Sequence, residues 1–69
     1  MTDSLAEALP REMTRVRDVI LPRYVAIGPR GQWAAAMMRA DLDAAQKAMI
    51  EGDVVAMIRA YKALKGYEA

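Results

Sequence analysis

The fold is decided by residues 32–65, which read QWAAAMMRADLDAAQKAMIEGDVVAMIRAYKALK. Gly52 and Asp53 stand between two segments with helical periodicity. Glycine readily takes the left-handed conformation that ends a helix, and aspartate at the next position can accept hydrogen bonds from the first N–H groups of a new helix. The stretch therefore predicts a helical hairpin, with helices near residues 31–50 and 54–65.

A third helix, near residues 10–27, is expected to cover this hairpin. Its apolar residues recur at the spacing of one helix face, namely Leu9, Met13, Val16 and Ile20. Pro22 either ends this helix or kinks it, because proline removes a backbone donor and disfavours a helical residue before it. We expect a kink, since Ile20, Tyr24 and Ile27 keep the helical phase.

Residues 1–9 are expected to be poorly ordered or to form one short turn. Ser4 and Glu7 fit a capping box, yet a helix that began there would hold Pro10 in its interior. Pro10 fits better at the first position of the main helix, where its missing N–H has no intrahelical partner.

These elements predict an all-α fold: one small domain over residues 1–69, with three helices and a C-terminal helical hairpin. A 69-residue chain is near the size at which a single core barely outweighs chain entropy. Zero cysteine and zero histidine exclude disulfides and the usual zinc and copper ligands. Proteins this small often gain stability from a partner subunit, so we expect a homodimer.

Composition also limits the function classes. Ten Lys and Arg residues against nine Asp and Glu give a net charge of +1, and the two signs are evenly spread, which disfavours a nucleic-acid surface. The sequence contains neither an apolar run long enough to span a membrane nor a signal-peptide pattern, so we expect a cytoplasmic protein without membrane contact. No catalytic spacing is present, and we expect no enzyme activity, catalytic residue, cofactor, metal or small-molecule substrate.

The best interpretation is a small helical protein-interaction or self-assembling module, whose partner is a second copy, another protein or both. Methionine and aromatic side chains of the apolar helix stripes are the candidate interaction surface, together with one carboxylate: Trp33, Met37, Met38, Asp41, Met49, Met57 and Tyr61. Two interpretations of these stripes stay open, because the residues can be entirely core or partly a docking face.

The alternative function is nucleic-acid binding. Its candidate residues are four arginines and the glycine-bearing turn between the first two predicted helices: Arg15, Arg23, Arg30, Arg39 and Gly28–Gly31. This turn resembles the GxxG loop of KH domains, which clamps a nucleic-acid backbone. An alanine-rich helical run follows the turn here, whereas a KH fold needs strands, so we expect a turn alone.

Asp41 interrupts the apolar stripe of the second predicted helix. Met37 and Met38 precede it by one turn, and Ala44 and Ala45 follow it by one turn. One interpretation places Asp41 at a solvated rim. The other buries it by half or more, paired with an arginine of the first helix such as Arg15 or Arg17.

Several short motifs also resemble small uncharacterised proteins encoded in phages and prophages. The residues that carry this resemblance are Glu12-Met13-Thr14-Arg15-Val16-Arg17-Asp18, Leu21-Pro22, Ile27-Gly28-Pro29, Gly52-Asp53-Val54-Val55-Ala56-Met57 and Leu64-Lys65-Gly66. The resemblance implies a bacterial, intracellular accessory protein of phage origin. It transfers no functional residue to this chain.

Overall fold

The computed structural model describes residues 4–68, which form three helical bodies and contain no strand. The elements are, in chain order, α1 (Leu5–Arg15), a π-helical turn (Val16–Ile20), α2 (Leu21–Ala26), a 3-10 turn (Gly28–Gly31), α3 (Gln32–Glu51) and α4 (Val54–Lys65). The first three run on without a break and make one body. The predicted all-α fold with three helices is confirmed.

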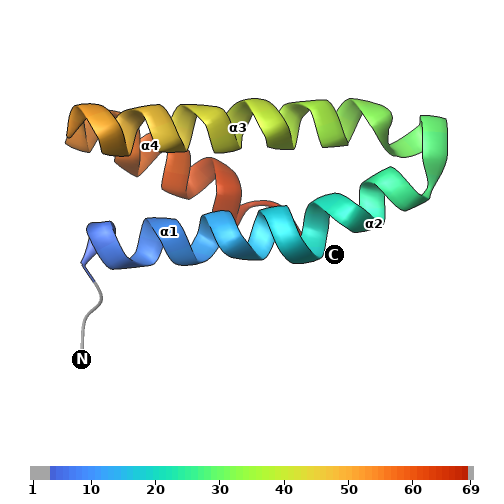
Figure 1. The fold of residues 1–69 in the computed structure, drawn as a ribbon, viewed down its shortest axis with the longest axis horizontal. Helices are drawn as coiled ribbons and strands as arrows, with labels where there is room; N and C mark the ends of the chain where they lie inside the picture. The colour runs from blue at the N-terminus through green and yellow to red at the C-terminus, as the bar shows by residue number, and fades with distance from the viewer. Residues whose placement is uncertain (1–3, 69) are drawn as a thin grey trace.

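The three bodies pack along one long axis, as Figure 1 shows. α3 runs antiparallel to the first body, and α4 folds back against both α3 and α1. The molecule measures 36 × 25 × 15 Å along its principal axes. We call the end where α2 turns into α3 the elbow, and the opposite end, at the α3–α4 joint, the tip.

The tip confirms the predicted hairpin. Gly52 has a left-handed conformation with φ of 67°. The Asp53 N–H donates to the Ala48 carbonyl at 3.0 Å and the Gly52 N–H to the Met49 carbonyl at 3.3 Å, which is the Schellman pattern. The Asp53 side chain then accepts a hydrogen bond from the Ala56 N–H at 3.1 Å and caps α4.

The start of α1 differs from the prediction. The helix begins at Leu5, and the Ser4 carbonyl accepts hydrogen bonds from the Glu7 and Ala8 N–H groups. Pro10 therefore lies inside α1, and its expected place at the first helical position was wrong. The early start brings Leu5 against the core, and this packing offsets the one hydrogen bond that proline removes. The expectation for residues 1–3 lies outside the described residues.

The first body also continues past Pro22, as predicted. In the π-helical turn the Leu21 N–H reaches back to the Val16 carbonyl, five residues earlier. α2 bends from the line of α1 toward α3, which is the predicted kink (Figure 1). The inward phase does not extend to Ile27, which is 57% exposed because the helix ends at Ala26 and the chain turns there.

The core is small and rich in alanine. Its large side chains come from all three bodies, and four alanines on α3 and α4 complete it: Leu9, Val16, Ile20, Met38, Leu64, Ala35, Ala45, Ala48 and Ala60. Alanine at helix contacts allows a close approach of the two helix axes. The hairpin thus packs tightly, but it buries little apolar area.

Candidate interaction surface

One side of α3 is exposed along its whole length. Its side chains recur at close to whole turns of the helix, and we call this side the outer face of α3: Trp33, Met37, Ala40, Ala44, Lys47 and Glu51. All of these residues are exposed, and Trp33 is 67% exposed. The face therefore presents an aromatic ring at the elbow, small residues in the middle, and a lysine and a carboxylate toward the tip.

The exposed large hydrophobic side chains fall into two groups. The elbow patch consists of Val19, Val25, Ile27, Trp33 and Met37. The tip patch consists of Met49, Ile50, Val54, Val55 and Ile58. Ile50 is the most exposed of them at 78%, since it points away from the core at the end of α3. Clustered exposed apolar side chains of this size mark binding surfaces more often than scattered single ones do.

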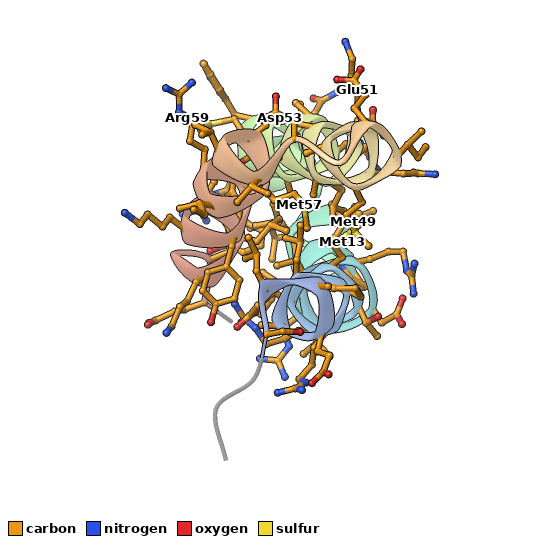
Figure 2. The ribbon with its side chains drawn as sticks, turned by 90° about the vertical axis from the view of Figure 1, so that its left-hand side faces the viewer. Met13, Met49, Glu51, Asp53, Met57 and Arg59 are labelled. Carbon is orange, nitrogen blue, oxygen red and sulfur yellow. The ribbon has the colours of Figure 1, made fainter. Side chains whose placement is uncertain are left out.

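The two ends differ in charge. No Asp or Glu occurs between Asp18 and Asp41, and this stretch contains the exposed residues Arg23, Arg30 and Arg39. The tip has Glu51 and Asp53, flanked in the sequence by Lys47 and Arg59. Figure 2, viewed from the tip, shows both carboxylates on the outside of the α3–α4 joint. The elbow is therefore basic, whereas the tip carries two carboxylates together with two cations.

The seven predicted surface residues do not form one surface. Trp33 and Met37 lie together on the outer face of α3, and Met49 is 37% exposed at the tip. Met38 is fully buried and belongs to the core, so its place in a surface was wrong. Met57 and Tyr61 are half-buried against the core. Figure 2 shows Met49 and Met57 on the inner sides of their helices.

Four exposed residues of the tip patch were missed: Ile50, Val54, Val55 and Ile58. Ile50 and Val55 lie next to the α3–α4 joint. A helical stripe read from sequence predicts which residues share a face, but it does not predict how much of that face the neighbouring helix covers. The sequence feature that could have identified these residues is their position next to the predicted joint between the two helices of the hairpin.

Asp41 is half-buried, as one interpretation required, but it has a different partner. The Tyr67 hydroxyl donates a hydrogen bond to Asp41 Oδ2 at 2.5 Å. Partial burial, this hydrogen bond and the carboxylate charge raise the pKa of Tyr67 to about 12. The predicted arginine pair was wrong, because Arg17 pairs with Asp18 at 2.9 Å and Arg15 lies against α4. The chain after Gly66 turns back toward α3, so that Tyr67 supplies the hydrogen-bond donor to Asp41.

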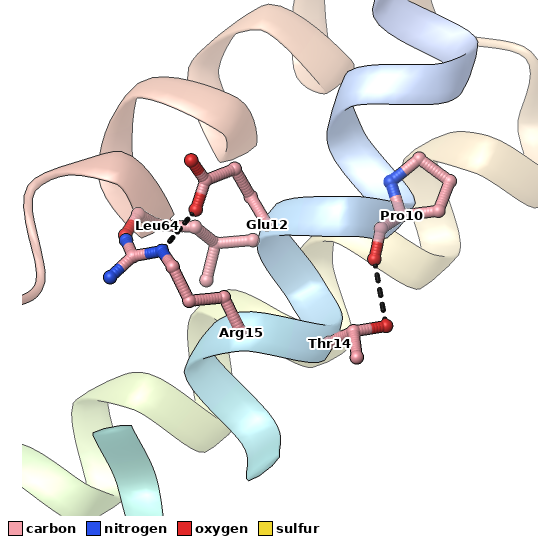
Figure 3. Close-up of polar contacts among 5 residues, drawn as sticks. All are labelled: Pro10, Glu12, Thr14, Arg15 and Leu64. Atoms are coloured by element: carbon pink, nitrogen blue, oxygen red, sulfur yellow. Dashed lines mark hydrogen bonds and ion pairs between the residues drawn. The ribbon is translucent and has the colours of Figure 1, made fainter. Parts of the chain in front are cut away.

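Arg15 ties the first body to α4. Its Nε donates to Glu12 Oε2 at 2.6 Å, and its Nη2 donates to the Leu64 carbonyl at 3.1 Å (Figure 3). A cation beside the last carbonyls of a helix also interacts favourably with the helix dipole. Arg15 therefore links α1 to α4, and it does not belong with the exposed arginines of the elbow, Arg23, Arg30 and Arg39.

Both glycines of the elbow turn have structural roles. Gly28 has φ of 76°, a conformation that side chains disfavour. A Cβ on Gly31 would lie 2.7 Å from Ile27 Cγ1 and closer still to the Tyr24 carbonyl oxygen, so α2 and α3 approach too closely for any side chain there. The GxxG spacing is accounted for by this turn, and it leaves Arg30 exposed at the elbow.

Among residues 4–68 no group of three or more acidic side chains could hold a metal ion. In the same part of the chain, no helix combines the length and the apolar character needed to cross a membrane. The chain matches no protein-family model, no curated protein and no solved structure.

Proposed function

We propose that this chain is a small, non-enzymatic helical module that acts by binding protein, and that its partner is a second copy of itself. One observation carries the proposal: the described residues expose ten large hydrophobic side chains and bury only five in the core. A monomer of this size gains little stability from so small a core. Covering the elbow and tip patches by association removes apolar area from water and adds the missing stability.

Light scattering over a concentration series tests this function. At micromolar concentration the mass should be twice the 7.6 kDa of one chain, and it should fall toward the mass of a single chain on dilution. The thermal midpoint should rise with protein concentration, because association stabilises only the folded chain. The mass of a single chain at every concentration, with a midpoint independent of concentration, would contradict self-association.

We further propose that the protein works in the cytoplasm of a bacterium or of a phage-infected host, as a phage-derived accessory protein. The support is the resemblance of residues such as Gly52-Asp53-Val54 to phage and prophage proteins. Cell fractionation of the native host, with the protein detected by antibody, tests the compartment. Recovery in the membrane fraction or the medium would contradict it.

A second candidate function is nucleic-acid binding at the elbow. It is favoured by the exposed arginines Arg23, Arg30 and Arg39, which share with the exposed Trp33 a stretch of sequence without carboxylates. Bases stack on aromatic side chains, and arginines hold the backbone phosphates. Trp33 is the only tryptophan, so titration with a single-stranded oligonucleotide should quench its fluorescence, more weakly at high salt. An unchanged signal at low salt excludes this function.

A further inference from the structure

We infer that two copies of this chain pair antiparallel through the outer face of α3, so that the elbow of each contacts the tip of the other. This inference rests on the proposed self-association and specifies its geometry. The occupant of the exposed face is a second copy of the same chain. Three features of the molecule lead to this arrangement: the straight exposed face, the different charges of its ends, with carboxylates at the tip alone, and the small residues in its middle.

The outer face of α3 extends over nearly the whole molecule. α3 has 20 residues and is therefore ~30 Å long, close to the 36 Å long axis. Trp33 and Glu51 are separated by about five full turns, and so point in the same direction from opposite ends of the helix. Antiparallel pairing about a two-fold axis near the middle of α3 places Trp33 of each copy beside Glu51 of the other.

The middle of the face permits a close approach. Ala40 and Ala44 are both exposed, and they lie between Met37 and Lys47 on the same side. Small residues where two helices cross let the axes come to about 8 Å, so that the larger side chains at either end reach the opposite helix. The two alanines alone would not identify a partner. The charged groups at the two ends of the face indicate that the partner is a second copy of the chain.

Charge decides the direction of the pairing. A contact of elbow with elbow brings Arg30 and Arg23 of two copies together, and a contact of tip with tip brings together Glu51 and Asp53 of both. Like charges disfavour each of these pairings. Antiparallel pairing sets Arg30 of each copy against Glu51 and Asp53 of the other, and the two-fold symmetry makes this favourable contact twice.

The antiparallel pair also covers apolar surface at both ends. A standard interface takes ~800 Å² from each partner, and the surface of this chain is 4885 Å². One end of so small a molecule offers only one patch. Pairing along α3 places Trp33 and Met37 of each copy against the tip end of the other copy's α3. The pair closes on itself, as isologous interfaces do.

Charge reversal at Arg30 and Glu51 tests the geometry. Arg30→Glu and Glu51→Arg should each raise the dissociation constant of the homodimer about tenfold, since each replaces two attractive contacts by repulsive ones. Mixed in equal amounts, the two variants should form a heterodimer about as tight as the wild-type pair, because both contacts become attractive again. Sedimentation of the two variants, one carrying a fluorescent label, measures this.

The variants have built-in controls. A carboxylate near the start of α3 and a cation near its end both favour the helix dipole, so neither variant should reduce the helix content measured by circular dichroism. Asp43→Arg makes the same charge change as Glu51→Arg, on the side of α3 that lies beside Met13 and Leu21. It should leave the dissociation constant unchanged within about twofold.

Every other outcome overturns the inference in an identifiable way. Monomers of wild type overturn both the pairing and the proposed self-association. A wild-type dimer that is tightened or unaffected by Arg30→Glu or Glu51→Arg overturns the antiparallel pairing and leaves self-association standing. Masses that grow beyond a dimer with concentration overturn the closed pair. The inference holds when wild type stops at a dimer, each variant weakens it and the mixture restores it.

Discussion

The α3–α4 hairpin and the first helical body are held in shape by different means. At the hairpin joint, local groups determine the conformation: Gly52 takes the left-handed region, and Asp53 caps α4. The first body contains two prolines and a π-helical turn, all of which local propensity disfavours. Its three core side chains, Leu9, Val16 and Ile20, are nevertheless almost completely buried.

This difference shows where the information for each region lies. Residues next to one another in sequence specify the hairpin joint, so it should survive changes elsewhere in the chain. Contacts with α3 and α4 hold the first body, so it depends on packing that only the folded chain provides. Substitutions that remove packing should therefore have larger effects than substitutions that remove caps.

The largest effect is expected at Ile20, in the π-helical turn. Ile20→Ala should lower the free energy of unfolding by about 2 to 5 kcal/mol, because it removes three carbons from a side chain that is 2% exposed. Val19→Ala is the control on the neighbouring residue, which is 45% exposed, and should cost about 0.5 kcal/mol or less. Urea denaturation of both variants makes the measurement. Equal midpoints would show that packing does not hold the first body.

The next effect is expected where the two regions meet, at Gly31. Gly31→Ala should destabilise the fold by roughly 1 to 3 kcal/mol, because the new Cβ clashes with the Tyr24 carbonyl oxygen and α2 must move. Gly66→Ala is the control, since its Cβ finds the nearest atom at 3.5 Å and its φ of −72° suits alanine. Thermal unfolding should separate the two clearly. A stable Gly31→Ala variant would refute the tight elbow.

The sequence predicted the hairpin to within a residue or two because glycine and aspartate act on their immediate neighbours. The sequence did not predict the start of α1. Pro10 locally disfavours a helix there, whereas Leu5 and Leu9 become buried only when the rest of the chain packs against them. For the candidate surface, the sequence left open whether the stripe was core or docking face. In the structure Trp33 and Met37 are exposed and Met38 is buried, a division that helical phase alone does not predict at the edge of a stripe.

A smaller effect is expected at the hairpin cap. Asp53→Ala removes the acceptor for the Ala56 N–H and should lower the free energy of unfolding by about 1 kcal/mol. Asp53→Asn keeps a capping oxygen and should cost less than half as much. Both variants should unfold in the same cooperative transition as wild type in urea. A loss as large as that of Ile20→Ala would mean that the joint, rather than the packing, dominates stability.

The smallest effect is expected for the contact that replaces the predicted arginine pair. Tyr67→Phe leaves half-buried Asp41 without its 2.5 Å hydrogen bond and should cost about 0.5 to 1 kcal/mol at neutral pH. The folded-state pKa of Tyr67 is raised from 10.0 to about 12, so its contribution is complete below pH 10 and is lost as the pH rises toward 12.

A pH series of unfolding midpoints measures this contribution. Wild type should lose stability between pH 10 and pH 12 more steeply than Tyr67→Phe, because only wild type has the raised pKa at this position. Tyr61→Phe serves as the control, since it removes the phenol of α4 and keeps the contact between Tyr67 and Asp41. Parallel curves for wild type and Tyr67→Phe would contradict the role of this hydrogen bond.

The central claim is that the exposed outer face of α3 is where this chain meets its partner. Trp33 lies on that face, is 67% exposed in the single chain and is the only tryptophan, so its fluorescence reports on this surface alone. Emission spectra recorded through the dilution series, beside the mass from light scattering, test the claim most directly. We predict that the emission maximum shifts to shorter wavelength in step with the doubling of mass, as the indole leaves water. A doubled mass with the spectrum of a water-exposed tryptophan would contradict it.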